Sequence, residues 1–185
     1  MSQHSASTVF HTPVGPLYAR ADAGELTELS FVDRAKHISN GGAEHESSRA
    51  VVDAVERQIN EYFAGLRTTF DIPIKLMGSS FYVQVWEALR AIPYGVTVSY
   101  GHLARELGDP DGARAVGSAN GANPIVIIVP CHRVIGANGS LVGYGGGLHR
   151  KRILLDLESG RTTLDLALTP PAASTETLHT LRAAP

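Results

Sequence analysis

Apolar and polar positions alternate loosely over residues 8–32, where Pro13, Gly15 and Gly24 supply turn signals. Alternation with a period of two is typical of strands that bury one face. This segment therefore predicts two or three antiparallel strands. The inward-facing positions of the pattern are Leu17, Leu26, Leu29 and Phe31.

The spacing changes to that of a helix over residues 47–65, where apolar side chains recur every three or four positions and Gly65 ends the run. We expect a polar, glycine-bearing loop before this helix, at 37–48, and extended chain after it, at 68–76. Strands and one helix together indicate a small α/β unit that ends near residue 76.

Helical patterns dominate the chain beyond that point. Ser80, Ser99 and Asp111 are each placed to cap the N-terminus of a helix. The second and third of these helices, at 100–107 and 112–120, are separated by a four-residue turn. This layout is that of a helix-turn-helix.

A last helix is predicted at 149–158, after a glycine-rich loop. We expect an α+β fold with two domains, at 1–76 and 77–160. The remaining segment, 161–185, is rich in Thr, Ala and Pro, and we interpret it as a flexible tail.

Composition narrows the function classes only slightly. With 43% hydrophobic residues, a net charge of −2 and one cysteine, the chain is typical of a soluble protein without disulfides. We expect it to be cytoplasmic, because no signal-peptide or membrane-spanning pattern is present. Residues 75–155 carry 8 basic and 4 acidic side chains, against 6 and 10 in residues 1–74. A nucleic-acid site fits the second part better, although chance variation explains the asymmetry equally well.

The third predicted helix is unusual, because residues 112–121 contain three glycines, three alanines and one serine. Each interior glycine costs about 1 kcal/mol relative to alanine. Such residues either let two helices pack closely or let bare backbone approach another molecule. Few long polar side chains are available to identify bases in the major groove, so the composition favours the minor groove. Arg114 is the one long cation, suited to fill space in a duplex or to hold a phosphate.

Cys131 follows an apolar run, 125–129, and precedes His132 and Arg133. A free cysteine is most often a buried packing residue. A zinc site would need about four closely organised Cys or His ligands, so we expect no metal. Cationic neighbours lower the pKa of a thiol, and the two that follow Cys131 therefore favour a nucleophile.

A nucleophilic thiol needs a base and a group that orients the base. His132 is the candidate base, directly or through a water. Glu158 is the candidate acid, and Asp156 in the same turn fits the spacing as well. A Cys–His–acid arrangement suits a thiol hydrolase as well as an acceptor of alkyl groups.

The motif "PCHRV" at 130–134, with "RAVGSANGANP" before it and "GYGGGLHRKRILLDLE" after it, closely resembles the O6-alkylguanine-DNA alkyltransferases. The segment "FYVQVWEALRAIPYGVTVSYGHLA" resembles the helix and the helix-turn-helix entry of that family. These proteins repair DNA by taking an alkyl group from guanine onto their own cysteine. The resemblance covers nearly all of 8–160 and is strongest over 80–158.

The resemblance implies roles for individual positions. Cys131 would be the alkyl acceptor, His132 its base through a water, and Glu158 the acid that orients the histidine. Tyr100 would assist base rotation and protonate guanine, and Arg114 would replace the flipped base in the stack. The implied DNA-binding positions are Arg114, Ala115, Gly117, Ser118, Ala119 and Asn123, the last of which also structures the turn before the active site. The implied walls of the base pocket are Tyr144 and the backbone of Val134 and Gly145.

The same resemblance implies an N-terminal domain of ribonuclease-H-like topology and a winged helix-turn-helix-like motif in the second domain. We expect stoichiometric transfer of a methyl or alkyl group from O6-alkylguanine, and from O4-alkylthymine, to Cys131, without a cofactor. The partner would be double-stranded DNA, bound through the minor groove by a monomer that can cluster along it. A hydrolase would leave the helix-turn-helix unexplained, and a non-catalytic binder of alkylated DNA would have no need of Cys131.

Overall fold

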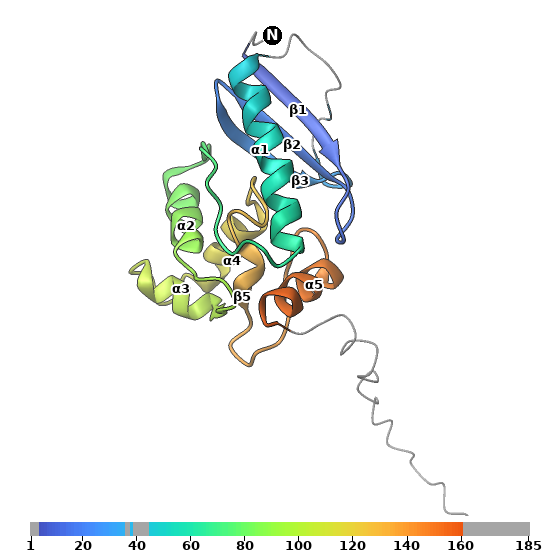
Figure 1. Ribbon diagram of the computed structural model, residues 1–185. Coiled ribbons are helices and arrows are strands. Elements are labelled where there is room, and N and C mark those ends of the chain that lie inside the picture. Colours follow the sequence, from blue (N-terminus) through green and yellow to red (C-terminus); the bar gives the residue numbers. More distant parts are fainter. Residues whose placement is uncertain (1–3, 36–37, 39–44, 161–185) are drawn as a thin grey trace, which may run out of the picture.

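The computed structural model describes residues 4–35, 38 and 45–160, so the predicted tail at 161–185 and most of the predicted loop at 37–48 lie outside the described residues. Figure 1 shows a sheet crossed by one long helix, with the other helices gathered at one end of this unit. The fold is therefore mixed α+β, as expected. Within the described residues, no helix has the length and apolar character needed to span a bilayer. The elements are β1 (Ser5–Phe10), β2 (Leu17–Asp22), β3 (Glu25–Phe31), α1 (Glu46–Phe63), α2 (Ser80–Arg90), β4 (Val98–Ser99), α3 (Tyr100–Glu106), α4 (Ala113–Gly121), η1 (Cys131–Arg133), β5 (Val134–Ile135) and α5 (Leu148–Glu158).

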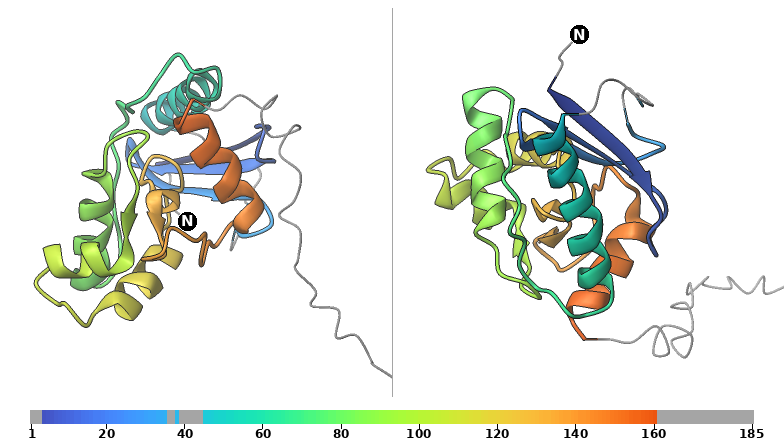
Figure 2. Two further views of the ribbon diagram at one scale, coloured as in Figure 1. Left: turned by 90° about the horizontal axis from the view of Figure 1, so that it is seen from below. Right: turned by 45° about the horizontal axis from the view of Figure 1, so that its top comes forward.

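The N-terminal sheet is antiparallel, with its strands in the order β1-β2-β3. Ala23 and Gly24 connect β2 to β3, and both have positive φ (51° and 80°), which is the backbone of a tight hairpin turn. The helix α1 covers one face of the sheet in all views (Figures 1 and 2). The inward positions expected from the alternation are confirmed, because each is at most 1% exposed: Leu17, Leu26, Leu29 and Phe31.

The outer edge of β3 is covered by two segments from the rest of the chain. Leu29 donates its N–H to Pro124 (2.9 Å) and accepts from Val126 (2.8 Å). Leu26 likewise donates its N–H to Pro73 (2.8 Å) and accepts from Lys75 (2.9 Å). These bonds make an isolated bridge at Ile74, in the extended segment after α1. Covering an edge strand removes a surface that would otherwise pair with other chains. It also attaches the segment before Cys131 to the N-terminal sheet.

The helix caps agree only partly with the prediction. Ser99 accepts a hydrogen bond from the N–H of His102 (3.1 Å) and caps α3, as expected. The cap of α2 is Ser79, one residue before the predicted Ser80. The prediction for Asp111 is wrong, because Gly112 occupies the N-cap of α4 without a side-chain bond.

The helices α2 and α3 both pack against α4. Trp86 of α2 donates its indole N–H to the carbonyl of Ala119 (2.8 Å), and this bond lies in the buried interior. Val85 and Leu89 on α2 and Val116 on α4 are at most 1% exposed. The small-residue helix is therefore held on one side by the core, which leaves its other side open to solvent.

Candidate active site

The apolar run before Cys131 forms a sequence of tight turns rather than a strand. The N–H of Ile128 bonds the carbonyl of Val126 (2.8 Å), which closes a γ-turn around Ile127 at φ 72°. A β-branched residue rarely adopts this conformation, so the turn is strained. The backbone N–H of Cys131 donates to the carbonyl of Val129 (2.8 Å), and Cys131 is the first residue of the short helix η1.

Cys131 is only 3% exposed, yet it lines a cavity of about 400 Å³. This volume lies in the range of roughly 300–1,000 Å³ that is common for small-molecule sites. The thiol is therefore adjacent to a space that a ligand group can enter. The cavity is lined by Thr27, Glu28, Ser30, Phe31, Arg34, Asn120, Gly121, Ala122, Asn123, Pro124, Val126, Cys131, Tyr144, Gly145 and Gly146.

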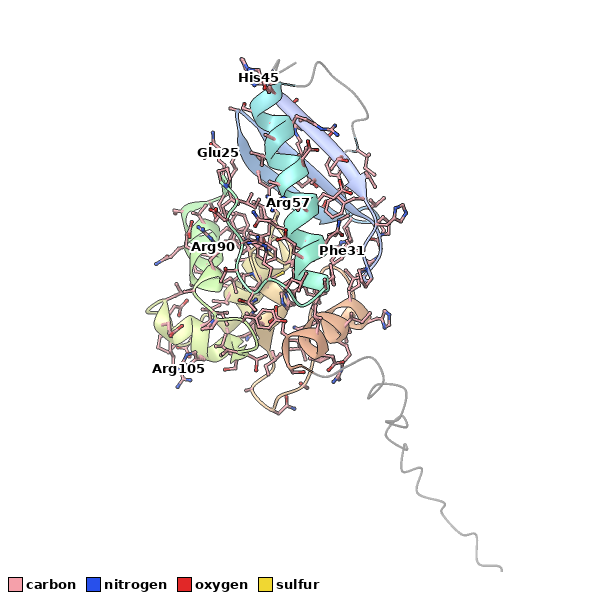
Figure 3. All side chains as sticks on the ribbon, viewed as in Figure 1. Glu25, Phe31, His45, Arg57, Arg90 and Arg105 are labelled. Atoms are coloured by element: carbon pink, nitrogen blue, oxygen red, sulfur yellow. The ribbon has the colours of Figure 1, made fainter. Side chains whose placement is uncertain are left out.

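One wall of this cavity comes from the N-terminal part of the chain, which the sequence did not indicate. Phe31 lies at the end of β3, where the sheet meets the helical part (Figure 3). A Cβ added to Gly146 would collide with the rings of Phe31 and Tyr144. The glycine-rich loop can lie against this aromatic wall only because it has no side chain at that position.

Burial raises the pKa of the Cys131 thiol. The side chain of Asn123, the charge of Lys151 and the backbone amides of Cys131 and His132 oppose this increase. The expectation that the two cationic neighbours would lower the pKa is wrong for the resting protein. Arg133 directs its guanidinium at Glu158, and His132 is neutral, so neither places a full charge at the thiol.

His132 is fully buried, and its Nε2 lies 2.9 Å from Oε1 of Glu158. Burial lowers the pKa of the imidazole, so the ring is neutral at neutral pH and Nε2 donates its proton to the carboxylate. Its Nδ1 is buried without a hydrogen-bond partner within the described residues, and is therefore free to accept a proton. Of the two acids that fitted the spacing, Glu158 is the one in contact with His132.

Glu158 receives more donors than a simple Cys–His–acid arrangement requires. Arg133 donates from Nε to Oε2 (2.8 Å) and from Nη2 to Oε1 (2.9 Å), which is bidentate pairing. Tyr62 of α1 donates to Oε1 (2.8 Å), and the N–H of Gly95 donates to Oε2 (3.2 Å). Burial alone would raise the pKa of this carboxyl, but the hydrogen bonds from His132 and Arg133 lower it to about 2. The acid is therefore ionised throughout the neutral range.

The exposed side of α4 carries Arg114, Ala115 and Ser118, and Gly117 is partly exposed. Ala119 is a correction to the expected DNA-binding set, because it is fully buried and its carbonyl accepts the indole N–H of Trp86. Asn123 connects the helix to the active site. Its Nδ2 donates to the carbonyl of Val129 (2.7 Å), and its Oδ1 accepts from the N–H of Ile125 (3.0 Å). This side chain closes the strained turn that positions Cys131.

Of the four residues expected around the base, two line the cavity and two do not. Tyr144 and Gly145 line the cavity, whereas Val134 is buried and does not line it. The Tyr144 hydroxyl is buried, and within the described residues no partner meets hydrogen-bond geometry. Burial and the nearby Cys131 thiol raise the pKa of this hydroxyl well above the usual value. Tyr100 lies beside the cavity rather than in its wall. Its hydroxyl is 3.1 Å from the carbonyl oxygen of Gly143 and 3.4 Å from Nδ2 of Asn120, which does line the cavity.

Two family models match the chain. A family model described as the ribonuclease-like domain of 6-O-methylguanine DNA methyltransferase matches residues 6–76. A second, described as the DNA binding domain of the same protein, matches residues 80–160.

Within the described residues, no group of three or more His, Cys, Asp or Glu is arranged to hold a metal ion.

The chain is 50% identical to a methylated-DNA–protein-cysteine methyltransferase of Mycobacterium tuberculosis. The 157 aligned residues cover 85% of this chain and 94% of the relative. A relative of the same name from Methanosarcina acetivorans is 45% identical, and the alignment covers 81% of this chain and 96% of that relative. The crystal structure of Mycobacterium tuberculosis OGT in complex with DNA matches with a TM-score of 0.76 and 46% identity, over 88% of this chain and 98% of that one. The chain therefore belongs to the methylated-DNA–protein-cysteine methyltransferase family.

Proposed function

We propose that this protein removes methyl or larger alkyl groups from O6 of guanine in duplex DNA by moving them to Cys131. The observation that carries the proposal is the position of the thiol. It lines a cavity, and the residue that follows it is a neutral histidine held by an ionised carboxylate. The same cavity is lined by the C-terminal end of α4, the helix whose outer side carries small, exposed residues. The names of its relatives support DNA as the substrate.

The reaction begins with loss of the thiol proton to Nδ1 of His132 through one water. The Glu158 carboxylate stabilises the imidazolium that forms. The thiolate then attacks the alkyl carbon in line with the bond to O6. A new S–C bond forms, the C–O bond breaks, and its electron pair stays on the guanine oxygen.

The purine leaves more easily if it gains a proton as the C–O bond breaks. Tyr100 is the proposed donor, and its phenolate then recovers the proton held by His132. Its hydroxyl now bonds the carbonyl of Gly143, so the side chain must exchange this bond for the purine. The products are neutral guanine and S-alkylcysteine. A thioether is stable, so each molecule reacts once.

The alkylated nucleotide must leave the duplex before the thiol can reach it. Flipping costs a few kcal/mol, and less for a mispaired base. The exposed side of α4 would enter the minor groove, where Arg114 would fill the place of the flipped base. The helices α3 and α4 would form the helix-turn-helix, with the loop after β5 as its wing.

We further propose that the chain divides into functional units near residue 76, and that it binds as a monomer that can cluster along DNA. Alkyl groups on O4 of thymine would enter the same cavity, because the reacting C–O bond has the same chemistry. Residues Ala115, Gly117 and Ser118 would lie against the sugar–phosphate backbone.

A titration with radiolabelled duplex tests the proposal against its competitors. O6-[methyl-³H]guanine duplex in excess should transfer one label per protein molecule and no more. Repeated turnover on an ester or amide substrate would instead support a hydrolase. Tight binding with no label transferred would support a non-catalytic binder of alkylated DNA.

A further inference from the structure

Lys151 in the first turn of α5 is fully buried, with an exposure of 0%. A buried ammonium is strongly unfavourable unless hydrogen bonds or an opposite charge compensate it. Its Nζ donates to the carbonyls of Val134 (2.6 Å) and Val142 (2.8 Å), and lies 3.5 Å from that of Gly143. Within the described part of the chain, no carboxylate forms an ion pair with it.

The three carbonyls belong to the two backbone segments that flank the acceptor. Val134 directly follows the short helix that carries Cys131, and Val142–Gly143 directly precede Tyr144 in the cavity wall. The Tyr100 hydroxyl also bonds the carbonyl of Gly143. Lys151 therefore connects the acceptor segment, the glycine-rich loop and the proposed proton donor.

The charge of Lys151 also acts on the acceptor. Burial lowers the pKa of Lys151 to about 8, and the negative charge of an ionised Cys131 opposes this decrease. The same interaction lowers the pKa of the thiol. The other titratable groups that face Lys151 are His132 and Tyr100, whose ring centroid lies 5.9 Å from Nζ. Both side chains are neutral in the resting protein, so neither is an anion that would pair with the Lys151 ammonium in place of the thiolate.

We propose that Lys151 is a positioning residue for the acceptor, whose buried ammonium balances the Cys131 thiolate and holds together the two backbone segments beside it. Arg133 cannot take this role, because its guanidinium is bound to Glu158 and to the carbonyl of Ile92. His132 acquires a charge only after it has taken the thiol proton. Lys151 is the cation that is in place beforehand.

The inference rests on the proposed function, but ionisation of the thiol can be measured without DNA. The probe is iodoacetamide, and the readout is the rate of Cys131 alkylation as a function of pH. Lys151→Met should move the midpoint of this profile upward by about one pH unit or more, which is a loss of about tenfold in rate at neutral pH. Lys151→Arg keeps the charge and should stay near the wild-type midpoint.

Lys75→Met is the matched control, because Lys75 is exposed, and it should leave the profile unchanged. A lower rate for Lys151→Met with an unmoved midpoint would overturn the role in charge balance. If the shift is present but no methyl moves from O6-methylguanine duplex in the wild type, the proposed function fails while this inference holds.

A second measurement covers the case in which Lys151→Met does not fold. The Lys151 amine can be titrated by NMR in the intact chain and in Cys131→Ser. Removal of the ionisable sulfur should lower the pKa of Lys151, because the thiolate no longer stabilises the ammonium. Identical titration curves in the two proteins would overturn the proposal.

Discussion

Side chains at the active site form hydrogen bonds with partners that cannot be inferred from their order in the sequence. Arg133 follows His132 directly, yet it binds Glu158 in a bidentate pair rather than contacting the thiol. The carboxylate is therefore held by a permanent cation, and its pKa falls to about 2. A carboxylate this weakly basic orients His132 and stabilises its charged form without taking the proton itself.

Replacement of Glu158 by Gln should slow methyl transfer by about a hundredfold or more, because the amide cannot stabilise the imidazolium that forms on His132. Single-turnover transfer from O6-methylguanine duplex measures this rate. The control is Glu87→Gln, which removes an exposed carboxylate that pairs with Arg90 at the surface and should leave the rate unchanged. An equal rate in both variants would contradict the role of Glu158.

Stability in acid should depend on the same carboxyl. Its pKa is lower in the folded protein than its usual 4.5, so the stabilisation is fully present above about pH 4.5 and is lost as the pH falls toward 2. The shift corresponds to an amount on the order of 3 kcal/mol. Urea unfolding between pH 5 and pH 2.5, roughly the range set by these two values, should show a smaller pH dependence for Glu158→Gln than for Glu87→Gln.

For single residues, the sequence predicted features that depend on neighbouring positions along the chain. The adjacency of Cys131 and His132, and the acid in the last helix, could be inferred from spacing and from the resemblance. Tyr62 and Lys151 could not, because their importance depends on contacts made across the fold. The pKa of the thiol was predicted in the wrong direction, because adjacency in sequence does not measure burial.

Among the elements, α4 and the segment after it carry most of the functional geometry. The helices were predictable from apolar spacing, and Ser99 from its capping position. The run at 125–129 was not predictable, because five apolar residues fit a buried strand as well as a series of tight turns. The side chain of Asn123 selects the turns by bonding at both ends of the run.

Arg114→Ala tests the proposed use of the exposed side of α4. The variant should capture an extrahelical base less well, so transfer from duplex DNA should fall at least tenfold while reaction with free O6-benzylguanine stays near wild type. The reason is that a free base needs no flipping. Arg57→Ala is the control, because Arg57 is an exposed arginine on α1, outside the proposed helix-turn-helix (Figure 3). Equal losses on both substrates would contradict the role of Arg114.

At the scale of the whole molecule, the N-terminal sheet unit is part of the site rather than an attached module. It supplies one wall of the cavity through β3, and Tyr62 of α1 bonds the acid that orients His132. The division of the chain near residue 76, inferred from the change in apolar spacing, stays a prediction. The cavity shared by both parts of the chain was not expected, since a pattern along the chain does not show which distant segments meet.

Tyr62→Phe should therefore slow methyl transfer several-fold, although Tyr62 lies on α1 and not on the helices proposed to bind DNA. The ring keeps its packing, while the carboxylate oxygen that accepts from His132 loses a donor. The control is Tyr82→Phe, since Tyr82 on α2 is partly buried and makes ring contacts with Phe81 and Trp86. Thermal unfolding of both variants separates a loss of stability from a loss of rate. An unchanged rate for Tyr62→Phe would show that the two units act independently.

Transfer of the alkyl group to Cys131 can be observed by incubation with duplex DNA containing O6-methylguanine, followed by digestion and peptide mass analysis. We expect one methyl group in place of the thiol hydrogen of Cys131, with complete conversion at equimolar DNA. Cys131→Ser should still bind the duplex but yield no methylated peptide. Methyl on any other residue, or transfer by Cys131→Ser, would show that Cys131 is not the acceptor.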